Sequence, residues 1–197
     1  MIDVSIIKEI KEYANIENVP IMQDEGIAFL TDFIARNNTV NVLEIGTAIG
    51  YSAIMMALTN DRVKVTTIER DENRYLEAVK NVKRLGLEDR ITLIFKDALE
   101  VNLNEKFDLI FLYGAKGQNI NFFEHFERNL SENGYVITDN INFHGYVKKD
   151  ESEIKSRNLR GLVRKIKNYI NYLKSSIKYE TTFYDKGDVI SVTRRKR

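Results

Sequence analysis

The sequence has no cysteine, no tryptophan, a single proline and two histidines in 197 residues. Without cysteine it can form neither a disulfide framework nor a thiolate metal site. No apolar run approaches the ~18 residues that suggest a membrane-spanning helix. The first residues also lack the basic and then apolar pattern of a signal peptide. These absences predict a cytoplasmic protein that has no membrane partner.

A large excess of one charge is also missing, since the formal net charge is only +1. The charges are nevertheless unevenly placed. Residues 147–197 contain 15 Lys and Arg against 6 Asp and Glu, a net charge of +9, which leaves −8 for the remainder. A basic surface attached to an acidic body is typical of a protein with a polyanionic partner, although a solvated helix face followed by a basic tail has the same composition.

The apolar pattern predicts an α/β protein. Its length is typical of one domain, spanning residues 1–197. Helical periodicity predicts helices over residues 3–17, 21–36, 51–59, 71–85, 119–130 and 157–175. Apolar or alternating runs predict strands over residues 40–45, 63–69, 91–96, 107–113, 134–138, 179–185 and 188–194.

The order of these elements predicts the sheet. Strands that alternate with helices form a parallel, doubly wound sheet. The last two strands are separated only by a short turn near Lys186-Gly187, which predicts an antiparallel hairpin. We therefore expect a Rossmann-like, seven-stranded and mostly parallel sheet that ends in a hairpin. In such sheets the ligand lies beyond the carboxyl ends of the strands.

The most informative pattern is a strand that runs into a glycine turn and then a helix. Residues 42–45 are apolar apart from Glu44, and Gly46 and Gly50 precede a helix that begins near Tyr51. Glycines let the backbone approach a ligand closely, and the helix start offers unpaired N–H groups. A carboxylate at this turn attracts the ammonium and sulfonium charges of S-adenosylmethionine and would repel a pyrophosphate. The turn also lacks the full Gly-x-Gly-x-x-Gly of an NAD site.

Polar residues follow the next two predicted strands. Glu69 ends the second strand, 23 positions after Gly46, where a carboxylate can chelate a ribose diol. Asp97 and Ala98 follow the third strand, where they can contact an adenine amino group, although Asp97 can equally form a turn.

Asp139 and Asn140 end the fifth predicted strand, and Lys116 lies in the loop after the fourth. Carboxylate and amide oxygens are ligands for a hard divalent cation, which would orient a substrate oxygen. Lys116 can accept that oxygen's proton if its pKa is lowered. Taken alone, the Asp–Asn pair is also an ordinary turn, and Lys116 an ordinary loop lysine.

Together, three motifs resemble the cation-dependent O-methyltransferases, the family of the catechol and caffeoyl-CoA enzymes. They are residues 43–52, Ala115-Lys116-Gly117-Gln118 and residues 139–145, and the resemblance covers essentially the whole chain. It implies a class I methyltransferase fold, a homodimer, and helices within residues 1–37 that form part of the substrate or dimer surface. It assigns Lys116 as the base and Asp139 and Asn140 as Mg²⁺ ligands. It implies that the cofactor-binding residues are Glu44, Gly46, Thr47, Gly50, Tyr51, Ser52, Glu69, Asp97 and Ala98.

Residues 157–166 and 179–184 resemble the bacterial branch of this family that methylates 5-hydroxyuridine at the tRNA wobble position. This resemblance gives the basic C-terminal quarter a partner, because Lys and Arg on one helix can bind tRNA phosphates. Small catechol-like or phenolic acceptors are the alternative. The residues expected at the acceptor are Met22, Tyr113, Phe143, His144, Arg160 and Arg164.

One departure concerns the metal. The family usually has an aspartate ligand at the end of the fourth strand, where this chain has Tyr113. A neutral phenol is a poor Mg²⁺ ligand, and tyrosine ionises only near pH ~10. Three interpretations follow. The metal is held more weakly, or Lys116 and Tyr113 handle the proton without metal, or the protein binds cofactor and RNA with little activity.

Overall fold

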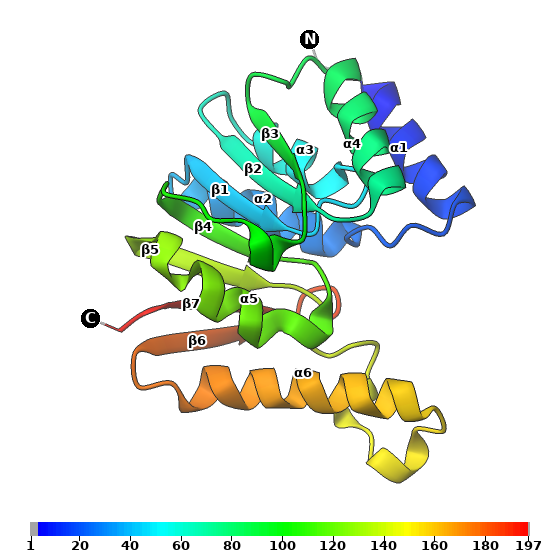
Figure 1. Cartoon of the computed structure of the whole chain (residues 1–197), viewed down its shortest axis with the longest axis vertical. Coiled ribbons are helices and arrows are strands. Elements are labelled where there is room, and N and C mark those ends of the chain that lie inside the picture. Colours follow the sequence, from blue (N-terminus) through cyan, green and yellow to red (C-terminus); the bar gives the residue numbers. More distant parts are fainter. Residues whose placement is uncertain (1–3, 197) are drawn as a thin grey trace.

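The computed structural model describes residues 4–196 and contains a seven-stranded sheet with the order β3-β2-β1-β4-β5-β7-β6 (Figure 1). Neighbouring strands from β3 to β5 are parallel, and β7 is antiparallel to both β5 and β6. The predicted doubly wound sheet with a terminal hairpin is confirmed. The strands are β1 (Asn41–Ile45), β2 (Lys64–Glu69), β3 (Ile91–Phe95), β4 (Phe107–Leu112), β5 (Leu130–Thr138), β6 (Tyr179–Tyr184) and β7 (Ile190–Arg195).

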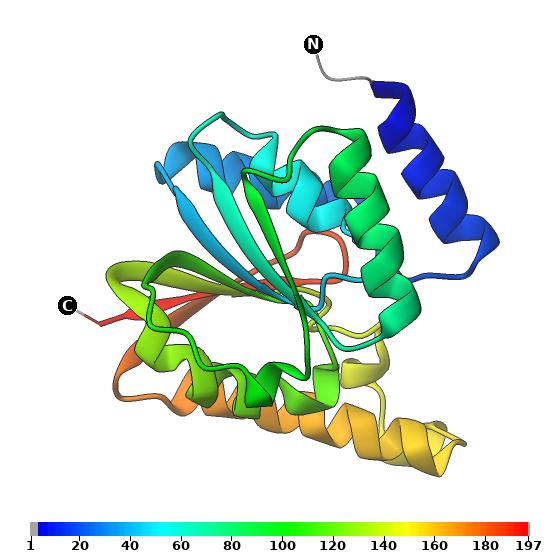
Figure 2. The same ribbon diagram turned by 45° about the horizontal axis from the view of Figure 1, so that its top comes forward.

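Helices cover both faces of the sheet (Figures 1 and 2). Because strand side chains alternate in direction, Val42 of β1 joins the apolar cluster under the first four helices, while Leu43 joins the cluster under the last two. Among the described residues no helix is long and apolar enough to cross a membrane. The helices are α1 (Val4–Ile16), α2 (Asp24–Arg36), α3 (Tyr51–Ala57), α4 (Glu72–Arg84), α5 (Asn119–Phe126) and α6 (Arg157–Ser175).

Two helices, α4 and α6, begin at a side chain that caps them. Asp71 caps α4, since its side chain accepts a hydrogen bond from the Arg74 N–H at 3.0 Å, and Gly86 follows that helix with φ +63°. The predicted start of α1 at Asp3 lies outside the described residues. Helix α6 is bound to the sheet by Tyr169, whose hydroxyl lies 2.7 Å from Thr138 Oγ1 at the end of β5.

Besides the start of α2, which lies at Asp24 rather than at residue 21, two features differ from the prediction. The helix expected over 119–130 ends at Phe126, and β5 begins at Leu130 rather than at 134. Its pairing with β4 shifts register between Phe107 and Leu109. Gly134 explains the irregularity, because a Cβ atom there would lie 2.8 Å from Leu130 Cδ1. The glycine allows the bulge. In the sequence, the same glycine looks like the start of the strand.

The second difference is the final turn, which is longer than predicted. Strand β6 ends at Tyr184 and β7 begins at Ile190, so five residues connect them. The turn is bound to the start of α2, because the Gly187 N–H donates to Glu25 Oε2 at 3.0 Å. Gly187 and Val189 both have positive φ angles, +56° and +64°. The contact with α2 therefore stabilises a five-residue turn. A two-residue turn would be too short to reach α2.

Strand register brings the site residues together. Leu112 of β4 lies opposite Ile45 of β1 and Thr138 of β5. The next residues along these three strands are Gly46, Tyr113 and Asp139, which consequently share one edge of the sheet. This is the carboxyl edge, where ligands bind in open parallel sheets.

Candidate active site

A cavity of about 290 Å³ opens at the carboxyl edge of the parallel strands. Seven residues predicted for the site line it, and they come from loops after β1, β2, β3, β4 and β5. The lining residues are Pro20, Ile45, Gly46, Ala48, Ile68, Glu69, Arg70, Arg74, Lys96, Asp97, Ala98, Tyr113, Gly114, Ala115, Lys116, Phe122 and Asn140.

The glycine turn forms one wall of the cavity. Gly46 has φ +100°, and a Cβ atom there would lie 2.6 Å from Gly114 Cα. Gly50 has φ +86° and faces Ala78 of α4, where an added Cβ atom would lie 3.3 Å from the alanine Cβ. Both positions therefore require glycine, for the close approach of two loops at Gly46 and for the turn into α3 at Gly50.

Glu69 links the glycine turn to the end of β2. Its Oε2 accepts the Ala48 N–H at 2.8 Å, and its Oε1 accepts the N–H groups of Arg70 and Asp71, each at 2.9 Å. The side chain is only 8% exposed, yet it lines the cavity. Three accepted bonds leave room for a further donor, because a carboxylate has about four acceptor positions. Glu69 is thus fixed in place and still able to bind a hydroxyl.

Asp97 and Ala98 lie at the same end of the cavity. Asp97 accepts the Leu99 N–H at 3.0 Å and forms an ion pair with Arg70 Nη1 at 3.3 Å. Asp97 therefore forms a turn and also borders the cavity, and its contact with adenine stays a prediction. Its side chain is about one-third exposed, which leaves it accessible to a ligand.

Glu44 is close to this wall but does not line the cavity. It is fully buried, and it accepts hydrogen bonds from the Ser52 hydroxyl and from Thr67 Oγ1 at 2.6 Å. Thr47 Oγ1 lies 2.6 Å from the same Thr67 hydroxyl. Burial raises the pKa of Glu44 to about 7, although the two hydroxyl donors lower it. The structure places Glu44, Thr47 and Ser52 in a buried polar cluster beneath the glycine turn.

Tyr113 and Lys116 border the other end of the cavity. Lys116 Nζ lies 5.3 Å from the centroid of the Tyr113 ring. Burial lowers the pKa of Lys116, while the carboxylates of Asp139 and Asp188 raise it. Burial and the charges of Asp139 and Glu44 raise the pKa of Tyr113, so its phenol remains protonated at neutral pH. Lys116 therefore has the character of a buried base.

Asp139 and Asn140 follow β5 beside these two residues. Asp139 is 8% exposed, and burial raises its pKa against the opposing effect of Lys116. Asn140 adopts a left-handed conformation with φ +62° and lines the cavity. Its Oδ1 atom is buried and has no hydrogen-bond partner among the described residues. A buried amide oxygen without a partner is suited to receive a donor from a ligand.

Asp188 is a site residue that sequence reasoning missed. It lies in the turn between β6 and β7, and its charge acts on both Lys116 and Asp139. Its Oδ2 accepts the His144 N–H at 2.5 Å, and its backbone oxygen accepts the Asn142 N–H at 3.0 Å. An aspartate after Lys-Gly is a common turn residue, and no local signal shows that the turn reaches the end of β5.

The predicted Mg²⁺ site can be compared with these donors. Asp139 supplies one carboxylate and Asn140 one unpaired amide oxygen, whereas Tyr113 supplies a protonated phenol. Within residues 4–196 no group of three His, Cys, Asp or Glu side chains could hold a metal ion. The cation of Lys116 also acts on Asp139. This donor set does not fit a resident Mg²⁺ ion, and the metal stays a prediction from the sequence.

Several predicted residues lie away from the cavity lining. Met22 is 2% exposed and packs under Gly26, and Tyr51 is 4% exposed, so both belong to the apolar core. Phe143 and His144 lie in the loop after Asn140, and their rings are 5.7 Å apart. The structure thus gives Met22 and Tyr51 packing roles, because apolar side chains between α1, α2 and α3 are removed from solvent.

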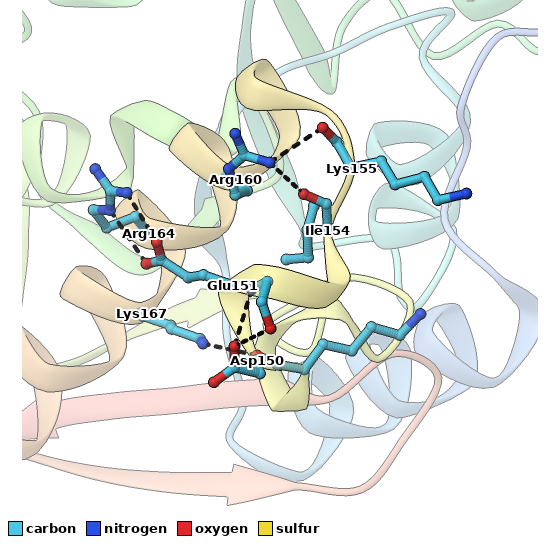
Figure 3. Close-up of polar contacts among 9 residues, drawn as sticks. Asp150, Glu151, Ile154, Lys155, Arg160, Arg164 and Lys167 are labelled. Atoms are coloured by element: carbon cyan, nitrogen blue, oxygen red, sulfur yellow. Dashed lines mark hydrogen bonds and ion pairs between the residues drawn. The ribbon is translucent and has the colours of Figure 1, made fainter.

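The two arginines predicted to contact tRNA bind other groups of the same chain (Figure 3). Arg160 Nη1 donates to the backbone oxygens of Ile154 and Lys155 at 2.6 and 3.1 Å. Arg164 forms an ion pair with Glu151 at 2.9 Å. Both contacts fasten the segment before α6 to that helix. Exposed basic side chains on α6 and this segment are Lys148, Lys149, Lys155, Arg157, Arg164, Lys165 and Lys174.

Comparison with known proteins is consistent with this geometry. The sequence model of the O-methyltransferase family matches residues 2–196. The caffeoyl-CoA O-methyltransferase of Populus kitakamiensis is 26% identical over 194 residues, 94% of this chain and 82% of that protein. An Arabidopsis thaliana relative is 29% identical over 151 residues, which cover 74% of this chain and 65% of its own length.

Solved structures agree with the family model. A putative caffeoyl-CoA O-methyltransferase from Staphylococcus aureus has a TM-score of 0.91 and 36% identity, covering 96% of this chain and 92% of that chain. An O-methyltransferase from Bacillus cereus, solved with S-adenosylhomocysteine, has a TM-score of 0.83, with 24% identity over 98% of this chain and 91% of that chain. The fold and the cavity define a class I methyltransferase. The chain belongs to the O-methyltransferase family and is an S-adenosylmethionine-dependent enzyme of that class.

Proposed function

We propose that the cavity binds S-adenosylmethionine with its ribose at Glu69 and its adenine near Asp97 and Ala98. The methyl acceptor then lies at the other end, beside Lys116 and Asn140. The observation that carries this proposal is one cavity that contacts all of these residues. The cofactor supplies a methyl group on a positively charged sulfur.

The residues at the acceptor end have separate tasks. Lys116 accepts the proton of the acceptor hydroxyl, because burial lowers its pKa and so favours the neutral amine more than in an exposed lysine. The unpaired Asn140 Oδ1 is free to receive a hydrogen bond from the acceptor. The acceptor oxygen forms its bond to the methyl carbon as the carbon–sulfur bond breaks, and the electron pair remains on sulfur. The enclosing loops align the two partners and exclude water.

We further propose that the acceptor is the 5-hydroxyl of a tRNA wobble uridine, which is acidic enough to need little activation. Two features support this choice. The basic C-terminal quarter carries a net charge of +9. Helix α6 also borders the Lys116 loop, since a Cβ atom on Gly117 would lie 3.3 Å from Lys165 Cδ. Phosphates bound along α6 would thus bring a nucleotide close to Lys116.

The test is transfer of a labelled methyl group to tRNA that contains 5-hydroxyuridine. Transfer to this tRNA and not to unmodified tRNA is expected, with binding that weakens as salt rises. Lys116→Ala should reduce the rate by about 10²- to 10⁴-fold, the usual contribution of a general base. Lys64→Ala is the matched control, because this exposed lysine begins β2, at the end of the sheet opposite the cavity. Equal transfer to unmodified tRNA would rule out the wobble hydroxyl.

Small phenolic acceptors are the second candidate, favoured by the caffeoyl-CoA names of similar proteins. Transfer to catechols or caffeoyl-CoA, with no saturable tRNA binding, would establish this alternative. Cofactor and tRNA binding without transfer to any acceptor would indicate a binding protein. A homodimer and a cytoplasmic location stay predictions from the sequence.

A further inference from the structure

Tyr113 lines the cavity together with Lys116 and Asn140. It follows β4, and its sheet neighbours at this edge are Gly46 and Asp139. Its ring stacks on Phe111, with centroids 5.5 Å apart and planes 13° apart, and it packs against the core cluster beneath α2 and α3. The side chain is thus part of the packed core, and its hydroxyl stays protonated. This position supplies no anionic oxygen.

The cationic group next to Tyr113 is the side chain of Lys116. Lys116 Nζ lies over the Tyr113 ring at 5.3 Å, within the range of a cation–π contact. Two carboxylates, Asp139 and Asp188, act on the same amine from the ends of β5 and the β6–β7 turn. An ammonium at Lys116 is therefore stabilised by the charges of these two carboxylates and by the aromatic face of Tyr113.

The second of these carboxylates is held firmly. Asp188 accepts the His144 N–H, and the backbone around it pairs with residues 141 and 142 at 2.9 and 3.0 Å. The same turn is bound to α2 through Gly187 and Glu25. Asp188 is consequently fixed beside the loop that follows Asn140, and one of its oxygens is already engaged. Of the two carboxylates that act on Lys116, only Asp139 directly follows β5, next to the cavity-lining Asn140.

We propose that this enzyme methylates its acceptor without a resident divalent cation, and that the ammonium of Lys116 takes the place of that charge. The inference rests on the proposed hydroxyl methylation. The hydroxyl proton passes to Lys116 Nζ, and the resulting ammonium faces the acceptor oxygen while Asp139 and Asp188 stabilise it. The oxygen bonds to the methyl group, the carbon–sulfur bond breaks toward sulfur, and the lysine later releases its proton to water. A divalent ion at this place would be repelled by the ammonium that forms when Lys116 accepts the proton.

The first test measures metal binding directly and needs no acceptor. Mn²⁺ is titrated into the wild-type protein in the presence of S-adenosylhomocysteine, with free Mn²⁺ followed by electron paramagnetic resonance. We expect no stoichiometric binding below about 1 mM. Binding of one Mn²⁺ at micromolar concentration, lost in Asp139→Asn, would overturn the inference. Because no methyl acceptor is present, this result is independent of the proposed substrate.

Two substitutions at one position sharpen the result. Tyr113→Asp adds a carboxylate beside Asp139 and is expected to strengthen Mn²⁺ binding by at least tenfold. Tyr113→Phe, the matched control, keeps the ring under Lys116 and is expected to bind Mn²⁺ no better than wild type. Equal Mn²⁺ binding by Tyr113→Asp and wild type, with an unchanged melting temperature, would contradict the role assigned to this position.

Activity provides the second test. Wild-type methyl transfer is expected to be unchanged, within twofold, by EDTA in large excess over the enzyme and over any trace metal. Asp188→Asn keeps the acceptor for His144 and removes the charge, so we expect a lower kcat, a shifted pH–rate profile and little change in KM. Loss of activity in EDTA that Mg²⁺ restores would overturn the inference. Failure of transfer in every condition would instead count against the proposed function.

Discussion

Gly46 lies against the backbone of Gly114 so closely that a Cβ atom on Gly46 would be 2.6 Å from Gly114 Cα and 2.7 Å from Gly114 N. This contact joins the loop after β1 to the loop after β4, and the two loops form one wall of the cavity. The backbone there has little freedom, since the Gly46 N–H also donates to the Ile68 oxygen at 3.0 Å. The shape of the cofactor end therefore depends on the absence of two side chains.

Gly46→Ala should prevent cofactor binding. The added methyl group clashes with backbone atoms, and φ +100° is strained for any residue with a Cβ atom. We expect S-adenosylhomocysteine binding, measured by calorimetry, to weaken by more than about 100-fold, with a lower melting temperature. Gly161→Ala is the control, since a Cβ atom there meets nothing within 4 Å and alanine favours the helix by about 0.5–1 kcal/mol. Normal binding by Gly46→Ala would show that the two loops separate freely.

Glu69→Gln should weaken the cofactor complex while leaving the fold in place. An amide NH₂ group would face backbone N–H donors of residues 48, 70 or 71, and one charged acceptor for the ribose would be lost. Hydrogen bonds to charged groups contribute about 1.5–3 kcal/mol, so we expect a 10- to 100-fold rise in the dissociation constant of S-adenosylhomocysteine. Glu72→Gln, at an exposed position in the first turn of α4, should bind like wild type.

Glu44 should make stability depend on pH. Its pKa is raised to about 7 in the folded protein, from 4.5 for an ordinary glutamate, mainly by burial. Between pH 4.5 and about 7 the folded state therefore binds a proton that the unfolded state has released. The stability that Glu44 contributes is fully present below pH 4.5 and is lost as the pH rises to about 7. A shift of this size corresponds to about 3 kcal/mol at most.

Urea unfolding of wild type and Glu44→Gln between pH 4.5 and 8 measures this effect. The amide keeps the shape of the side chain and cannot ionise. We expect the stability of wild type relative to the variant to fall over this range and to level off above pH 7. A constant difference between the two proteins would show that Glu44 does not titrate there. Ser52→Ala should increase the dependence, because the Ser52 hydroxyl stabilises the charged form.

Arg160 should prove structural rather than RNA-binding. Its guanidinium holds two backbone oxygens of the segment before α6, as Figure 3 shows. In Arg160→Gln we expect amide hydrogen exchange in residues 150–156 to become about 10-fold faster, because the segment loses two charge-assisted hydrogen bonds. Lys165→Gln is the control on the same helix and should leave exchange unchanged, since Lys165 is exposed and the oxygens of residues 154 and 155 are held by Arg160. Unchanged exchange in Arg160→Gln would contradict this structural role and favour the tRNA contact predicted from the sequence.

Much of the fold was predictable because its signals are local. Alternating apolar runs located all seven strands to within a few residues, and Asp71 marked the start of α4. The glycine turn and the strand-end Glu69 predicted the cofactor end of the cavity, because the carboxyl ends of parallel strands converge. The beginning of β5 was missed, since the bulge at Gly134 depends on its pairing with Phe107 of β4, a strand from another part of the chain.

The sequence by itself determined the doubly wound sheet, the tight turn at Gly46 and the placement of Lys116 and Asp139 at strand ends. Only the tertiary structure decided which side chains face the ligand. It buried Glu44 behind the turn, placed Met22 in the core and brought Asp188 to Lys116 from the final hairpin. The physical reason is range: strand and turn formation depend on neighbouring residues, whereas burial and charge depend on packing between segments far apart in the chain.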